Sequence, residues 1–215
     1  MIVATGESDG RKATKITEIF KWQNEDNSTC HLPDYPVAIK GAVTVMIGDK
    51  EYICGGYPWT TQCFSFIGDE APFNLLHNKA GSSSVTINST AFVFGGNDQD
   101  SYETISVDFA QSEGVLPFTL NSGCATLINI TTMLLAGGDQ DGTTQSKTWL
   151  YNFQTEEWTQ GPSMIENRVA FGCGYIESIN SVAAFGGYEP PKATTEILKL
   201  PGGSFKQGNC RCLFY

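Results

Sequence analysis

Short apolar stretches recur along the chain, and several of them end at a pair of glycines. The pairs lie roughly 40 to 50 residues apart, a spacing that indicates a repeat architecture. A weaker copy lies near the N-terminal end, where the glycine is followed by glutamate instead of a second glycine. The glycines that define the pattern are Gly6, Gly55, Gly56, Gly95, Gly96, Gly137, Gly138, Gly186 and Gly187.

The hydrophobic alternation around each glycine pair predicts four short antiparallel strands. Two strands joined by a turn precede the glycines, as in GAVTVMIGDKEYICGG, and a loop and an alternating third strand follow them, as in TISVDF. A shorter fourth strand is clearest in EEWTQGPSM. Four antiparallel strands repeated at this period are typical of β-propeller blades. In such a blade, the glycines would permit positive φ angles and close backbone contact near the central channel.

We therefore predict an all-β chain that forms a single domain over residues 1–215. The predicted fold is a β-propeller with three complete four-stranded antiparallel blades and an incomplete unit at each end. The last unit shows no recognisable fourth strand, because it ends in NCRCLFY. The predicted units span approximately residues 1–36, 37–78, 79–120, 121–166 and 167–215.

Composition and charge narrow the kinds of partner. The chain is 40% hydrophobic, so a sizeable core is expected. A formal net charge of -10, with 13 basic residues, argues against nucleic acid and against an anionic membrane surface. No apolar stretch approaches the roughly 18 to 20 residues that cross a bilayer, and the first residues are not typical of a signal peptide. We expect no nucleic-acid partner and no membrane insertion.

The repeat resembles the kelch repeat. The resemblance is strongest over residues 124–164, where a glycine pair is followed by Tyr151, by Trp158 with six residues between the two, and by GPSM. The strand NRVAFGCGYI continues the match, and the other glycine pairs extend it over essentially the whole chain. The tyrosine and tryptophan are absent from the second and third units. The resemblance implies a propeller of kelch-type blades and, in most of the family, six or seven of them.

Two pairs of cysteines occupy informative positions in the repeat. Cys54 ends a second strand and Cys63 begins the next strand, so the two could face each other, and both a disulfide and buried thiols remain open. Cys124 and Cys173 stand where other repeats have alanine and serine, which favours small packing residues in a crowded first strand. The remaining cysteines, Cys30, Cys210 and Cys212, indicate no zinc site.

Three N-x-[ST] sequons start at Asn27, Asn88 and Asn129. Each is a candidate glycosylation site of a secreted protein. The alternative is turn chemistry, which we favour at Asn88 and Asn129, because asparagine tolerates left-handed geometry between two strands. Asn180 occupies the same kind of turn without a sequon. Asn27, in an acidic loop, is the best candidate for a glycan.

The loops after the glycine pairs and the segments that cross to the next blade emerge at one end, because strand direction alternates. Aromatic side chains among charges are typical of recognition surfaces. The acids favour a partner with a basic surface, although Asp is also an ordinary turn residue. The residues expected on this partner-binding face are Tyr35, Tyr57, Trp59, Asp98, Asp100, Asp139, Asp141, Tyr188 and Glu189.

The function favoured by these features is a non-enzymatic protein-interaction module, with an extracellular place favoured over the cytoplasm. The resemblance also implies an alternative, the substrate-recognition propeller of a BTB–kelch ubiquitin ligase adaptor, which would need BTB and BACK domains upstream. A third and weaker alternative is a copper enzyme similar to galactose oxidase. The chain has only two histidines, His31 and His77, so we expect no metal site, no cofactor and no catalytic residues.

Overall fold

The computed structural model describes residues 2–8, 12–19, 34–97, 99–188 and 190–208, and within these ranges the chain is all-β. The one helical element there is a short 3-10 turn, Glu177–Ile179. Four antiparallel sheets follow one another along the sequence, the first with three strands and the others with four. We number the sheets in chain order.

Within each sheet, the strands lie side by side in the order in which the chain makes them. The first sheet contains β3 (Val43–Ile47), β4 (Lys50–Cys54) and β5 (Cys63–Ser65). The second contains β6 (Ser83–Ile87), β7 (Thr90–Phe94), β8 (Gln99–Ile105) and β9 (Gln111–Leu120). The third contains β10 (Cys124–Leu127), β11 (Thr132–Ala136), β14 (Thr148–Asn152) and β15 (Glu157–Gln160). The fourth contains β16 (Gly172–Ile176), β17 (Ser181–Phe185), β18 (Thr195–Lys199) and β19 (Phe205–Gln207).

Two small hairpins lie outside these sheets. One is formed by β12 (Asp139–Gln140) and β13 (Thr143–Thr144), in the loop between the second and third strands of the third sheet. The other is formed by β1 (Ile2–Ser8) and β2 (Lys12–Ile19). Gly6 lies inside β1, beside an irregularity in the strand pairing, and so does not follow a strand as the glycine pairs do.

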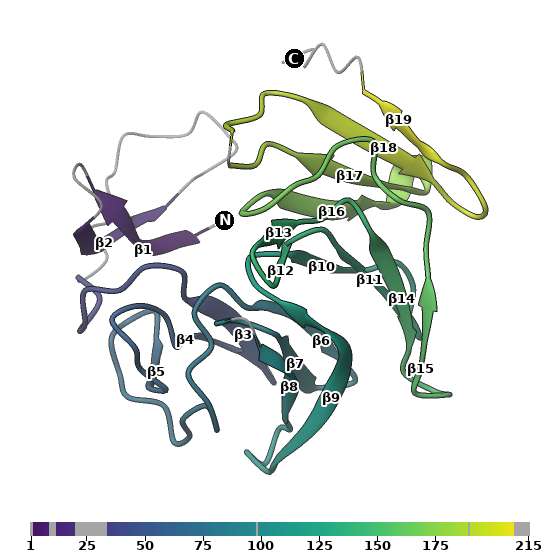
Figure 1. Ribbon diagram of the computed structural model, residues 1–215. Coiled ribbons are helices and arrows are strands. Elements are labelled where there is room, and N and C mark those ends of the chain that lie inside the picture. Colours follow the sequence, from purple (N-terminus) through teal and green to yellow (C-terminus); the bar gives the residue numbers. More distant parts are fainter. Residues whose placement is uncertain (1, 9–11, 20–33, 98, 189, 209–215) are drawn as a thin grey trace.

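The four sheets are arranged in an arc, with their first strands β3, β6, β10 and β16 innermost (Figure 1). Backbone hydrogen bonds link the residues just before these strands from sheet to sheet. Gly81 N donates to Gly41 O at 2.8 Å, Ser122 N to Gly81 O at 2.6 Å, and Ala170 N to Ser122 O at 2.8 Å. All four residues have positive φ angles, between 49° and 72°. The same local backbone shape therefore joins each sheet to the next.

The core lies between successive sheets. Every second residue of β3 is buried, so Val43, Val45 and Ile47 pack in one cluster with Ala91 and Val93 of the second sheet. Full burial of one such aliphatic side chain stabilises the fold by roughly 1.5 to 3 kcal/mol. The cluster between the third and fourth sheets contains Leu134, Ala136, Val182, Ala184, Leu198 and Phe205.

The glycine pairs are confirmed as turn and packing residues. All eight of their φ angles are positive. A Cβ on Gly96 would lie 3.0 Å from Ala80 O, and one on Gly138 would lie 2.8 Å from Asn121 O. Each second glycine thus lets the loop pass against the backbone of the segment that enters the same sheet.

The sheets differ from the predicted units at two places. The last unit does have a fourth strand, β19, so the expectation that it lacks one is wrong. The unit 37–78, expected to be complete, has three named strands among the described residues. The segment after β5 is hydrogen-bonded to β5 without forming a named strand, for example from Ala71 N to Cys63 O at 2.9 Å. Tyr151 and Trp158 face each other across β14 and β15, with ring centroids 4.7 Å apart.

Candidate interaction face

We call the residues that lead into the first strand of a sheet its crossing segment. Each loop that follows a glycine pair is hydrogen-bonded to the crossing segment of its own sheet. The residue two positions after the first glycine donates its backbone N–H to a crossing-segment carbonyl. We call these four loops, with the crossing residues that they contact, the diglycine face. The donors Tyr57, Asn97, Asp139 and Tyr188 bond to the carbonyl oxygens of Lys40, Ala80, Asn121 and Val169 at 2.8, 2.9, 2.7 and 2.9 Å.

An exposed aromatic pair stands on the first loop of this face. Tyr57 and Trp59 retain 45% and 64% of their accessible surface, and their rings meet edge to face with centroids 5.2 Å apart. Lys40 Nζ lies 5.7 Å from the Tyr57 ring centroid, within the range of a cation–π interaction. The backbone bonds of Tyr57 and these ring contacts connect the pair to the crossing segment.

The remaining described residues of the predicted face are distributed over the other loops. Tyr188 is exposed at the fourth sheet, and Asp100 is exposed near the start of β8. Asp139 Oδ1 accepts a bond from Gly142 N at 2.7 Å, and the Thr119 hydroxyl donates to Asp141 Oδ1 at 3.1 Å. Both aspartates therefore have local roles in the turn, as well as negative charge near the surface.

The prediction that Tyr35 belongs to the face is wrong. Its side chain is buried, its hydroxyl donates to Ile53 O at 2.8 Å, and its ring packs against Phe64 with centroids 5.6 Å apart. Burial raises the pKa of the Tyr35 hydroxyl. The sequence places this tyrosine in a crossing segment, but only the fold turns it inward. Asp98, Glu189 and the sequon at Asn27 lie outside the described residues.

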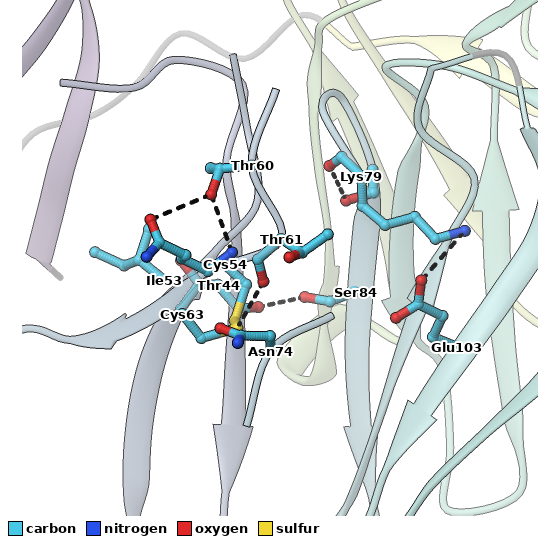
Figure 2. The surroundings of a disulfide bond; sticks show 12 residues. Thr44, Ile53, Cys54, Thr60, Thr61, Cys63, Asn74, Lys79, Ser84 and Glu103 are labelled. Carbon is cyan, nitrogen blue, oxygen red and sulfur yellow. Dashed lines mark hydrogen bonds and ion pairs between the residues drawn. A yellow bond between two sulfur atoms is a disulfide. The ribbon is translucent and has the colours of Figure 1, made fainter. Parts of the chain in front are cut away.

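Two cysteine pairs lie at disulfide distance. Cys54 and Cys63 are buried on the paired strands β4 and β5, with their sulfurs 2.07 Å apart (Figure 2). The sulfurs of Cys124 and Cys173 are 2.15 Å apart and connect β10 with β16. The interpretation of Cys124 and Cys173 as small packing residues is therefore corrected: equivalent positions of neighbouring sheets meet in space, with Cα atoms 5.9 Å apart. Cys30, Cys210 and Cys212 lie outside the described residues.

A buried carboxylate that the sequence analysis missed organises the second crossing segment. Glu103 Oε2 accepts from Leu76 N, and its Oε1 accepts from His77 N, both at 2.8 Å. Lys79 Nζ lies 4.0 Å from Glu103 Oε1 (Figure 2). It also donates to the Ser101 hydroxyl at 2.7 Å. Burial raises the pKa of Glu103 and lowers that of Lys79.

The fourth sheet repeats this arrangement. Glu196 accepts backbone bonds from Ile165 N and from Glu166 N, and the fully buried Arg168 lies 3.0 Å from its Oε1. Further bonds from the guanidinium reach Thr194 and the carbonyl of the first glycine of the pair. The sequence contains one signal for this arrangement. In the repeats of the second and fourth sheets alone, a glutamate in the third strand occurs together with a basic residue at the matching position of the crossing segment.

Among the described residues there is no candidate metal centre. Three or more His, Cys, Asp or Glu side chains do not gather there in a metal-binding arrangement. His77 Nε2 instead lies 3.0 Å from Glu113 Oε1 at the surface. No helix in the described ranges is long and apolar enough to span a membrane.

Comparison with protein-family models and with curated protein sequences gives no match. The functional interpretation therefore depends on the residues of the chain itself.

Proposed function

We propose that the chain is a non-enzymatic protein-interaction module that binds a protein partner through the diglycine face. The observation that carries the proposal is the exposed Tyr57–Trp59 pair. Large aromatic side chains are enriched among the residues that contribute most to protein–protein binding. Because the backbone of the loop is already bonded to its crossing segment, little conformational freedom would be lost on binding.

The scaffold that we propose is a kelch-type β-propeller. Support comes from antiparallel sheets in an arc, from glycine pairs at the same position of each sheet, and from the contact of Tyr151 with Trp158. Closure of the sheets into a full ring is part of the proposal. Such a ring leaves only short strand edges and presents the loops at its two ends.

We infer that the partner has a basic surface. Asp100 and Asp141 are exposed and carry negative charge near the loops that hold the aromatic pair and Tyr188. The net charge of -10 adds a long-range attraction for cationic partners. Such charges increase the rate of association more than the affinity, so binding should slow as salt is raised.

The cysteine pairs support an extracellular location for this module. Disulfides persist in oxidising compartments and are rare in the cytoplasm. One pair at disulfide distance joins two strands of the first sheet, where Cys54 and Cys63 are fully buried, and the other joins the third sheet to the fourth.

Selection from a displayed library of random peptides tests the proposed function. We expect the peptides retained by the immobilised protein to be enriched in Lys and Arg. Trp59→Ala should weaken their binding about tenfold or more, the effect of removing an aromatic interface anchor. The matched control is Ile130→Ala, an exposed residue on the turn between β10 and β11, which should leave binding unchanged.

Two results would contradict the proposal. One is selected peptides without basic residues, which would remove the charge argument. The other is equal binding by the wild type and by Trp59→Ala with an unchanged melting temperature, which would exclude the aromatic pair as the contact.

A further inference from the structure

The two described sequons lie at the end of the sheets opposite the diglycine face. Asn88 is in the turn between β6 and β7, and Asn129 is in the turn between β10 and β11. Antiparallel strands place these first turns and the loops after the second strands at opposite ends. Both asparagines are exposed, and the sequon threonines are Thr90 and Thr131.

The turn at Asn129 uses only one end of the side-chain amide. Its Oδ1 accepts bonds from Thr131 N at 2.8 Å and from the Thr131 hydroxyl at 3.0 Å. In the part of the chain that is described, Nδ2 of Asn129 donates no hydrogen bond, and the same holds for Asn88, whose φ is 48°. Turn chemistry and glycosylation are therefore compatible at these positions, because they use different atoms of the amide.

The non-sequon turn of the fourth sheet differs in this respect. Asn180 Nδ2 donates to Leu200 O at 3.0 Å, while its Oδ1 accepts from the Tyr175 hydroxyl at 2.9 Å. Both ends of that amide are engaged. The free amide nitrogen is thus a property of the two sequon turns and not of every asparagine at this end.

An apolar hollow lies between the two sequon turns. Its volume is about 380 Å³, and Asn88 and Asn129 are both part of its lining. Ile130, which is part of the lining, is 85% exposed. A group that covers these apolar side chains would remove their surface from water, which is favourable. The other lining residues are Thr86, Ile87, Leu127, Ile128, Ile130 and Tyr175.

We propose that Asn129 and Asn88 are N-glycosylation sites and that their glycans cover this hollow. In the reaction, the amide nitrogen attacks the anomeric carbon of an oligosaccharide carried on a lipid pyrophosphate. The new C–N bond replaces the C–O bond to the pyrophosphate, the amide loses one proton, and the lipid pyrophosphate leaves. No oxidant or reductant is required.

Glycans at this end would leave the diglycine face accessible. The proposal does not depend on partner binding, because the sequons, the free amide nitrogens and the hollow are all separate from that face. Failure of glycosylation would leave the proposed interaction function standing, and the reverse is also true.

The test is mass spectrometry of the full chain secreted by eukaryotic cells behind a supplied signal peptide. Treatment with peptide N-glycosidase removes the glycan and converts each modified asparagine to aspartate, which marks its position. We expect both sequon peptides to be marked and the peptide that contains Asn180 to be unmarked. Asn129→Asp should lose one glycan while keeping the Oδ1 acceptor of the turn, and Thr131→Ser should keep the glycan.

Unmodified Asn129 and Asn88 in the secreted wild type would overturn the proposal whatever the variants do. A separate measurement tests whether the glycans cover the hollow: the fluorescence of a dye that binds apolar surfaces. Enzymatic removal of the glycans from the folded protein should raise this signal severalfold. An unchanged signal on a folded, deglycosylated protein would show that the glycans do not cover the hollow.

Discussion

The second and fourth sheets differ from the first and third in how they hold their crossing segments. In the second and fourth sheets, a buried glutamate of the third strand faces a buried basic residue of the crossing segment. In the other two, both positions are apolar. The third-strand residues that share this position are Phe64, Glu103, Trp149 and Glu196, and the crossing residues are Ile39, Lys79, Leu120 and Arg168.

The two solutions hold the crossing segment by different interactions. Glu103 and Glu196 each accept two consecutive backbone N–H groups of the crossing segment, which leaves the carboxylate well satisfied. In the apolar sheets the third-strand residue makes ring contacts instead: Phe64 packs against Tyr35 with centroids 5.6 Å apart, and Trp149 stacks on Phe118 with centroids 5.0 Å apart. The comparison teaches that the two positions work as a pair. Replacing one member of the pair should lower the free energy of unfolding more than replacing both members together.

The largest effect is expected from Glu196→Ala. This change leaves the fully buried Arg168 without its main carboxylate and leaves the N–H groups of Ile165 and Glu166 without acceptors. The free energy of unfolding should fall by about 4 to 5 kcal/mol, measured by denaturant titration. The matched change in an apolar sheet, Phe64→Ala, removes only the packing of a half-buried ring, so it should cost about 2 to 3 kcal/mol, less than at a fully buried phenylalanine.

Equal losses in these two variants would contradict the comparison, since they would mean that the carboxylate acts only by filling space. Glu196→Gln is a useful intermediate. It keeps one acceptor oxygen for the crossing segment and loses the charge, so its cost should lie between those of the wild type and Glu196→Ala.

A smaller effect is expected in the second sheet, where the cation is farther from the carboxylate. Lys79→Met leaves the buried Glu103 charge without a cation and should cost about 3 kcal/mol. The double variant Lys79→Met with Glu103→Gln removes both charges and should be more stable than Lys79→Met alone. A double-mutant cycle on the free energy of unfolding measures this coupling. Additive costs would show that the two residues are independent and would contradict the paired interpretation.

The smallest effect concerns Glu166, which is partly exposed beside the Arg168 cluster. The Thr194 hydroxyl, together with Lys192 and Arg168, holds the pKa of Glu166 below its ordinary value. Since the folded pKa is depressed, the stabilisation is present above the unfolded value of about 4.3 and is lost as the pH falls through the folded pKa. Glu166→Gln should therefore be slightly less stable than the wild type at neutral pH.

Thermal unfolding of both proteins as a function of pH checks this sign. The difference in melting temperature should shrink as the pH falls below the unfolded value of about 4.3, and it should disappear once the pH is below the depressed folded pKa, because the wild-type carboxyl is then protonated. A difference that persists at low pH would assign the effect to lost packing instead of lost charge.

Much of the fold was predictable, because it depends on signals local to each repeat. Successive positive φ angles favour glycine, and Gly95 with Gly96 adopt such angles in the second sheet. Alternating apolar residues such as Val43 and Val45 predict a strand with one buried face. On the candidate face, the exposure of Tyr57 and Trp59 agrees with the expectation for loops after a glycine pair.

The tertiary structure alone decided the features that join distant segments. Whether Tyr35 points inward depends on Phe64 and on the carbonyl of Ile53, which lie in a neighbouring part of the sheet. Cys124 and Cys173 meet because the first strands of successive sheets lie side by side, at a sequence separation of 49. A single repeat encodes its strands and turns in its own residues, whereas burial and pairing depend on which other repeat it meets.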